Sequence, residues 1–459
     1  MGLVDAIRRL TNAPAFKFLL IIVLILALAV PLLFVYLLVD ERARYAAGAE
    51  AEIGQAWGGA QTIRGPFVIV PTERERSVRN GNETRTEQVR ELAVFLPETL
   101  AIAPSAKTEM RSRGIYSVPV YRSTIAFTGR FDPPETRGIE TRGATILWEE
   151  AVLTLLVTDV RGIKQTAGIR LGPESTKFRS GPGVEAGLPP RQTGAIHVPL
   201  GAARARQGFD FAFTLDLAGS SSLNFVPAGG ESEIRLSSDW PHPSFSGAFL
   251  PETRKISSDG FEAFWKIPRL ARGQGQTLHV ASLAQLMQHA VFGVRFFQPV
   301  QFYSLAERAL KYAQGFIAIV FFTVFVMEMK SARRVHWIQY LFVGLALAIF
   351  YLVLIGTAEH IGFEGGYLAA AAATSLLVAS YVGTITGSTT RGAQIFAVIA
   401  TIYGLLYLLL RVEDYALLIG SVAAFALLAA IMFATRNVDW SRGSELAAPA
   451  RHGPEMPPT

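Results

Sequence analysis

The sequence predicts a membrane protein with six transmembrane α-helices, one N-terminal and five C-terminal, and a large mainly-β, sandwich-like domain between them. Three observations predict this fold class. Half of the 459 residues are hydrophobic and only 17% are charged, which is too apolar for an ordinary soluble domain. Long uncharged runs occur at 18–39 and repeatedly after 304, and each can cross a hydrocarbon core of about 30 Å. Between them, short β-branched runs alternate with Gly and Pro turns.

The composition excludes several classes of protein. The chain has no cysteine, so disulfides, thiolate nucleophiles and cysteine-based zinc or iron–sulfur sites are ruled out. The net charge of +6 is modest, and no basic cluster is interleaved with aromatic residues, so we expect no nucleic-acid partner. The sequence also contains no H-E-x-x-H pair and no Walker-type phosphate loop, which are common signs of metal and nucleotide sites. We therefore expect no cofactor.

Residues 1–17 are expected to form a cytoplasmic N-terminus, followed by a membrane anchor at 18–39. Arg8, Arg9 and Lys17 precede the anchor, and basic residues favour the cytoplasmic side of a membrane. A cleaved signal peptide is the competing interpretation, but its apolar region would span only about 7–15 residues. We favour a retained helix because the run at 18–39 is longer. Pro31 lies inside it and is tolerated in a membrane helix.

Residues 40–303 are expected to form the β-rich domain, although Glu41–Ile53 could first continue the anchor helix. The run Phe209–Leu217 alternates apolar and polar residues, as a half-buried strand does. Ile115–Tyr121 shows the same alternation. Many such short runs, separated by Gly and Pro, are typical of a β-sandwich or a pair of them. One short helix is expected at Ser282–Ala290.

Residues 304–436 are expected to form a five-helix transmembrane bundle. Its first helix, Ser304–Lys330, starts with charged residues and continues as an uncharged span. Ser304 and Glu307 have the spacing of a capping box, which predicts that the helix starts at Ser304. The other spans are expected at Val335–Ile355, Gly366–Ile385, Ala393–Leu410 and Tyr415–Thr435. We expect the first bundle helix to pack beside the anchor, because the two tether both ends of the β-rich domain.

The charges of the short loops predict the orientation. With the N-terminus in the cytoplasm, the loop after the first bundle helix places Lys330, Arg333 and Arg334 inside. Apart from Arg411, the basic residues of the short loops fall on the cytoplasmic side, in accordance with the positive-inside rule. The β-rich domain is then periplasmic and both termini are cytoplasmic. Residues 437–459 are rich in Pro and Ala, and we expect a disordered tail.

The expected span Gly366–Ile385 is rich in small residues. Small residues spaced four apart let helices approach closely, and close packing is the interpretation that we favour. A polar transport pathway lined by Ser375, Ser380 and Thr384 is the alternative. Transporters usually carry ionisable groups near the middle of the membrane, and no expected span has one there.

Four ionisable residues lie at the expected periplasmic ends of spans, namely Glu359, His360, Glu413 and Asp414. Anchoring at the membrane interface is the ordinary role of such residues, and we expect it for Glu328 at the opposite ends as well. The two periplasmic pairs could also form a proton or cation site, provided that their spans are neighbours.

In the β-rich domain, His242 and Ser244 lie in a segment with prolines at 241 and 243. These prolines restrict the backbone to extended conformations. A Ser–His pair is the basis of nucleophilic catalysis, but no nucleophile elbow and no third orienting residue accompany this one. We favour a rigid turn and keep a periplasmic hydrolase as a third hypothesis.

Several separate stretches carry a resemblance over nearly the whole chain. They are Arg111–Arg122, Ser238–Pro251, Gly293–Tyr312, Ile338–Ile355 with Glu359 and His360 after it, and Glu413–Trp440. Together they resemble the CreD family of bacterial inner-membrane proteins, the cell envelope integrity family. Gln301 stands where we expect the family to have Asp, which weakens any idea that this position carries a needed charge.

The resemblance implies an N-terminal anchor, a large periplasmic β domain and a C-terminal helical bundle. It also implies a role in envelope integrity, linked to two-component regulation, colicin tolerance and the response to β-lactams. No catalytic residue follows from it. We therefore expect a non-enzymatic inner-membrane protein whose partners are the lipid bilayer and a periplasmic envelope component or protein. A transporter or flippase-like protein that uses Gly366–Ile385 is the alternative.

Overall fold

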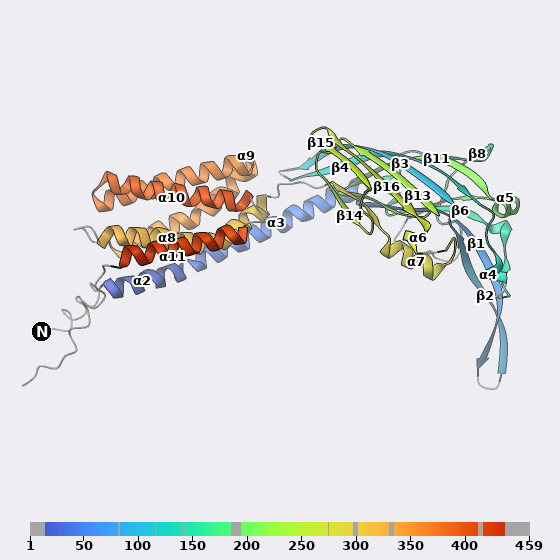
Figure 1. Cartoon of the computed structure of the whole chain (residues 1–459), viewed down its shortest axis with the longest axis horizontal. Coiled ribbons are helices and arrows are strands. Elements are labelled where there is room, and N and C mark those ends of the chain that lie inside the picture. Colours follow the sequence, from blue (N-terminus) through green and yellow to red (C-terminus); the bar gives the residue numbers. More distant parts are fainter. Residues whose placement is uncertain are drawn as a thin grey trace, which may run out of the picture. The chain divides into compact units, whose positions relative to one another are not determined.

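The computed structural model describes residues 14–80, 83–114, 116–140, 143–184, 194–273, 275–296, 302–329, 335–411 and 416–436. Two compact units divide the chain (Figure 1): a helical unit from residues 1–45 and 300–459, and a β unit from residues 46–299. Most of the expected cytoplasmic N-terminus and the whole tail at 437–459 lie outside the described residues. The domain limits at 39 and 303 stay a prediction, because the units do not mark the edges of a bilayer.

Six long helices belong wholly or partly to the helical unit. They are α2 (Pro14–Ala27), α3 (Ala29–Trp57), α8 (Phe302–Met329), α9 (Trp337–Thr386), α10 (Thr389–Arg411) and α11 (Ala416–Thr435). Four described helical stretches are long and apolar enough to cross a membrane, namely Phe16–Trp57, Phe302–Met329, Trp337–Thr386 and Thr389–Arg411. The first of these contains α2 from Phe16 onward and all of α3. α2 ends at Ala27 because Pro31 has no N–H to donate to the Ala27 carbonyl.

α9 is a helical hairpin that bends at Gly362. This residue has φ 78° and ψ 167°, a conformation that glycine adopts more readily than other residues. Phe350 and Tyr367 would be about 25 Å apart along a straight helix, but their ring centroids are 5.7 Å apart. The Thr357 hydroxyl donates to the Gly366 carbonyl at 3.3 Å across the bend. The two halves of α9 therefore lie against each other.

Small residues bring these helices into close contact, as predicted for Gly366–Ile385. A Cβ on Gly366 would lie 2.6 Å from the backbone nitrogen of Ala358. A Cβ on Gly392 of α10 would lie 2.9 Å from the carbonyl oxygen of Ala379. Neither position has room for a larger side chain, so close packing of the second half of α9 is confirmed.

The predicted pairing of the N-terminal anchor with the first bundle helix is confirmed. Phe18 of α2 and Phe325 of α8 have ring centroids 6.1 Å apart. The Gln314 side chain of α8 donates to the Ile25 carbonyl of α2 at 3.4 Å.

The predicted helix start at Ser304 is wrong. α8 already includes Phe302 and Tyr303, so Ser304 lies inside the first turn and not at the N-cap. Tyr303 is buried and donates a hydrogen bond to Glu359 of α9. We attribute the earlier start to this tertiary contact, which the local capping pattern does not include.

The β unit contains a ten-stranded and an eight-stranded sheet. The ten-stranded sheet consists of β1 (Gln61–Asn80), β2 (Glu83–Phe95), β5 (Thr145–Ile146), β6 (Val152–Val157), β9 (Arg179–Ser180), β10 (Gly194–Pro199), β12 (Ser222–Val226), β14 (Pro243–Gly247), β17 (Thr277–His279) and β18 (Phe292–Phe296). The eight-stranded sheet consists of β3 (Thr99–Arg113), β4 (Tyr116–Phe131), β7 (Gly168–Leu171), β8 (Glu174–Lys177), β11 (Phe209–Ser220), β13 (Glu231–Ser238), β15 (Thr253–Ser257) and β16 (Gly260–Pro268).

The strand orders show long-range pairing in both sheets. The main path of the ten-stranded sheet is β14-β18-β12-β1-β6-β10-β9, and that of the other is β15-β16-β13-β3-β4-β11-β7-β8. β1 pairs with β12, and β3 with β13, in the parallel sense. The short helices of the unit are α4 (Arg137–Glu140), α5 (Ala202–Gln207), α6 (Arg269–Arg272), α7 (Val280–His289) and the 3-10 turns η1 (Trp148–Glu150) and η2 (Val160–Gly162).

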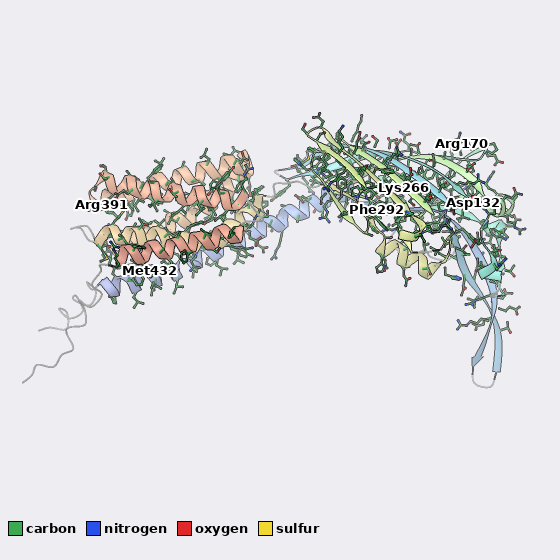
Figure 2. All side chains as sticks on the ribbon, in the orientation of Figure 1. Asp132, Arg170, Lys266, Phe292, Arg391 and Met432 are labelled. Carbon is green, nitrogen blue, oxygen red and sulfur yellow. The ribbon has the colours of Figure 1, made fainter. Side chains whose placement is uncertain are left out.

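Side chains from both sheets belong to one hydrophobic core, as in a sandwich. Phe127 on β4, Phe225 on β12 and Phe292 on β18, which is labelled in Figure 2, are fully buried. The predicted strand at Phe209–Leu217 is part of β11, and the predicted helix at Ser282–Ala290 corresponds to α7. The mainly-β prediction is thus confirmed.

Candidate functional site

A buried ion pair joins the N-terminal helix to the bundle. Lys17 of α2 pairs with Glu328 near the end of α8, and their side chains are 20% and 8% exposed. Lys17 Nζ also donates to the Val335 carbonyl at 2.7 Å. The Val335 N–H and the Tyr340 hydroxyl each donate to the Glu328 carboxylate at 2.9 Å. We call these four residues the Glu328 cluster.

A second carboxylate lies at the other end of α8. The Tyr303 hydroxyl donates to Glu359 Oε1 at 3.0 Å, and Arg42 Nη1 of α3 is 4.0 Å from the same oxygen. The Glu359 side chain is 12% exposed. We call Arg42, Tyr303 and Glu359 the Glu359 cluster.

The two clusters use the same chemistry at opposite ends of α8. In each, a carboxylate of the bundle accepts from a tyrosine and faces a cation of the N-terminal helix. A buried charge is costly unless it is paired and hydrogen-bonded, so each carboxylate requires its partner helix. Glu328 is covered by α2 and the start of α9, which supply Lys17 and Tyr340, and its predicted position at the membrane interface stays a prediction.

The C-terminal end of α3 packs so closely against β11 that two glycines there have no room for a side chain. A Cβ on Gly54 would lie 2.6 Å from Ser220 Oγ, and a Cβ on Gly58 would lie 2.7 Å from the Ala218 carbonyl oxygen. A Cβ on Gly162 would lie 2.4 Å from the same carbonyl oxygen. The helix end, η2 and β11 therefore meet at a point with no space for additional side-chain atoms.

Hydrogen bonds of the fully buried Gln61 side chain stabilise this junction. Its amide nitrogen donates to the Gly58 carbonyl at 2.6 Å and to the Asp159 carbonyl at 3.1 Å. Its amide oxygen accepts from the Asp159 N–H at 3.2 Å. Asp159 in turn caps η2, and hydrogen bonds from Arg161 lower the pKa of Asp159. We call Gly54, Trp57, Gly58, Gln61, Gly162 and Ala218 the α3 seat.

Trp57, the last residue of α3, is surrounded by three cationic side chains. The charged groups of Arg111, Arg122 and Lys164 lie 4.7, 5.1 and 5.6 Å from the centre of its ring. They come from β3, from β4 and from the segment after η2. The indole N–H donates to the Tyr121 carbonyl at 3.3 Å. Cation–π attraction therefore links the helix end to three separate parts of the β unit.

The structure does not bring His242 and Ser244 together as a base and a nucleophile. Both residues are exposed, and no hydrogen bond joins these two described side chains. The His242 carbonyl accepts from the Trp240 indole N–H at 3.1 Å, and Ser244 pairs with Arg295 in the ladder between β14 and β18. This geometry supports the rigid turn.

The predicted grouping of Glu359, His360, Glu413 and Asp414 is only partly visible. Glu359 belongs to the Glu359 cluster, whereas His360 is exposed. Glu413 and Asp414 lie outside the described residues. At the end of α10, Arg411 forms an ion pair with Glu364 of α9. A cation site formed by the four residues stays a prediction.

The hypothesis of a pathway lined by Ser375, Ser380 and Thr384 is wrong in its geometry. Ser375 is buried, whereas Ser380 and Thr384 are exposed on the outside of the helical unit. The two exposed hydroxyls donate to carbonyls of their own helix, at Leu377 and Ser380, both at 2.9 Å. At 100° per residue, Ser375 and Ser380 point in very different directions, so they cannot line one channel.

Sequence reasoning missed the Glu328 cluster and the α3 seat. The signal for the first is a charge at the edge of each of two long apolar runs, Lys17 at one and Glu328 at the other. The signal for the second is the glycine content around the end of the first helix, at Gly54, Gly58 and Gly59. Neither signal names its partner, because the partners are far away in the chain.

Comparisons with known proteins find a family match over nearly the whole chain. The family model described as Inner membrane protein CreD matches residues 13–441. The inner membrane protein CreD of Escherichia coli strain K12 is 31% identical over 417 residues, which cover 91% of this chain and 91% of that protein.

Among solved structures, a mutant M1 zinc metallopeptidase from Deinococcus radiodurans is 11% identical, and the alignment covers 66% of this chain and 93% of that chain. Its TM-score is 0.20, a likeness that carries no argument about fold or activity.

Proposed function

Because the chain belongs to the CreD family of inner membrane proteins, we propose that it is an envelope-integrity protein that acts by binding and not by catalysis. In this proposal, the β unit lies in the periplasm and binds an envelope component or a partner protein without transforming it. The helical unit anchors the β unit in the inner membrane.

The observation that carries this proposal is the helix α3. It runs without interruption from Ala29 to Trp57 and continues through the division between the two units at residues 45 and 46. In the helical unit, Arg42 contributes to the Glu359 cluster. In the β unit, the end of the helix is held by the α3 seat. One continuous helix therefore supplies residues to contacts inside each of the two units.

The proposed topology has six crossings. α9 can cross twice, because it is a hairpin bent at Gly362, and α11 adds one more apolar helix. With the stretch that contains α2 and α3, and with α8 and α10, these make six. The basic residues of the short loops favour cytoplasmic termini.

Reporter fusions test the orientation. A periplasm-active phosphatase fused after Gly229 and a cytoplasm-active reporter fused after Ser331 should both be active in cells. The reciprocal fusions, with the two reporters exchanged, should both be inactive. Activity of the exchanged pair instead would overturn the periplasmic placement of the β unit.

Hydrogen exchange of the full chain tests the binding function. We expect one class of envelope material, such as peptidoglycan fragments, lipopolysaccharide or solubilised lipoproteins, to slow backbone amide exchange within residues 46–299. A bound ligand suppresses the local opening through which these amides exchange. The added material should keep its mass after prolonged incubation. The proposal is refuted if no class of envelope material alters amide exchange in a chain that rescues a deletion strain. Chemical turnover of the added material would contradict binding without catalysis.

A further inference from the structure

Arg64 of β1 has an unusually poor set of partners for its burial. Its side chain is only partly exposed, and its Nε atom is buried without a hydrogen-bond partner. Within the described chain, the acceptor that it reaches is the Thr62 carbonyl, 3.4 Å from Nη1. A guanidinium has five N–H donors, so most of those of Arg64 are not used by described residues.

No described carboxylate forms an ion pair with Arg64. Burial disfavours the charged form of Arg64 and lowers its pKa, as it also does for Arg272. The ladder neighbours of Arg64 are Leu156 on β6 and Val226 on β12. Both are buried and apolar, so their side chains offer no acceptor.

Arg272 shows how this fold treats an arginine that is buried for structural reasons. Its Nη1 donates to the carbonyls of Ala228 and Gly229 at 2.6 and 3.1 Å, and its Nη2 donates to the side chain of Gln276 at 2.5 Å. The Nε atom of Arg272, like that of Arg64, is buried without a hydrogen-bond partner among the described residues, but its Nη atoms bind the loop before β13 and the Gln276 side chain. The Nη atoms of Arg64 make no comparable set of contacts with described residues, so a purely structural role explains this residue less well.

The backbone at Arg64 is also irregular. The ladder between β1 and β6 shifts register after Arg64 and resumes at Phe67, so Gly65 and Pro66 form a β-bulge. Gly65 has φ 100°, in the region that favours glycine. Bulges re-aim neighbouring side chains and are frequent next to functional sites.

We propose that Arg64 is an anion-binding residue of the β unit, whose guanidinium receives a phosphate or carboxylate group of an envelope component. Both groups present two oxygens to the planar fork of an arginine, which makes bidentate and charge-assisted hydrogen bonds. The anion supplies the acceptors and the negative charge that the described chain does not supply. The inference rests on the proposed binding function and names the chemistry of its ligand.

Thermal unfolding of the full chain in a neutral detergent tests this site. Inorganic phosphate and acetate are the probes, added at constant ionic strength with chloride as the balancing anion. We expect at least one of them to raise the unfolding midpoint of the wild-type chain saturably, because a ligand that binds only the folded state stabilises it. The response should be lost in Arg64→Met. In Arg64→Lys the apparent affinity for the anion should weaken by about tenfold, because lysine keeps the positive charge but lacks the paired N–H groups that bind an anion in a bidentate way.

Arg170→Met is the matched control, because Arg170 is an exposed arginine on β7 of the same unit (Figure 2). It should respond like the wild type. Without a ligand, Arg64→Met should unfold at the same or a higher temperature, because it removes a poorly paired, half-buried charge. An unchanged response in Arg64→Met, or no response of the wild type to either anion, would overturn the inference.

Two further measurements separate the sources of the anion and the two proposals. If free phosphate is the ligand, phosphate alone should slow exchange around Arg64 as strongly as the envelope material does. If the group belongs to a polymer, the polymer should bind more tightly and free phosphate should displace it. Envelope material that still protects the β unit of Arg64→Met would refute the anion site and leave the binding function intact. Absence of protection in every chain would refute the binding function itself.

Discussion

Lys17→Met should destabilise the helical unit by about 3–5 kcal/mol, the range measured when one partner of a buried ion pair is removed. The Glu328 side chain is 8% exposed and would keep only the donors Val335 N–H and Tyr340 O–H. The double variant Lys17→Met with Glu328→Leu should recover much of the loss, because it leaves no unpaired charge. The free energy of unfolding of the purified chain, titrated with a denaturing detergent, measures both effects.

The exposed pair Arg44–Asp40 of α3 is the control for this experiment. Their side chains are 79% and 39% exposed, and exposed i,i+4 pairs contribute at most about 0.5 kcal/mol. Asp40→Asn should therefore unfold almost like the wild type. If Lys17→Met were equally mild, the Glu328 cluster would not hold α2 to the bundle.

Gly58→Ala should destabilise the β unit by about 3 kcal/mol, because two costs add. Gly58 has φ 117°, which is unfavourable for alanine by about 1–3 kcal/mol. The new Cβ would also lie 2.7 Å from the Ala218 carbonyl oxygen and 3.0 Å from Gly162 Cα, and overpacking of this kind costs about 1–3 kcal/mol. Thermal unfolding of the full chain measures the loss.

A substitution at the adjacent residue Gly59 distinguishes the cost of backbone strain from the cost of steric crowding. It has φ 65°, but a Cβ there would meet no atom within 4 Å. Gly59→Ala should cost only about 1 kcal/mol, the ordinary penalty of a left-handed backbone. In a deletion strain, Gly58→Ala should rescue envelope integrity less well than Gly59→Ala. Equal stability and equal rescue would show that the α3 seat is not tightly packed.

The spans and the β-rich domain were predictable because their signals are local. An uncharged run such as 18–39 is apolar over a sufficient length whatever surrounds it. The strand β11 was predictable from the alternation of apolar and polar residues within Phe209–Leu217, since successive side chains of a strand point to opposite faces. The resemblance to the CreD family added an expected domain order, and the family match over residues 13–441 supports the resemblance itself.

The candidate sites were less predictable because their contacts are long-range. Lys17 and Glu328 were each visible as the charge at the end of an apolar run, and the ordinary expectation for such a charge is the membrane interface. The hydroxyls at 375, 380 and 384 were close in the sequence, but helical geometry places Ser375 on a different side from Ser380 and Thr384. The candidate His242 and Ser244 failed in the same way, since proximity in the chain does not align two side chains.

By itself, the sequence determined which segments are apolar helices, where the strands lie, and that cysteine chemistry is absent from this protein. Those properties depend on composition and periodicity within one segment. Only the tertiary structure decided that Lys17 pairs with Glu328, that Gly58 lies close to the Ala218 carbonyl, and that Arg64 is half-buried with few acceptors. Each of these depends on which faces of distant segments meet. Packing in three dimensions determines that, because burial, charge pairing and close backbone contact are properties of the surroundings and not of the residue alone.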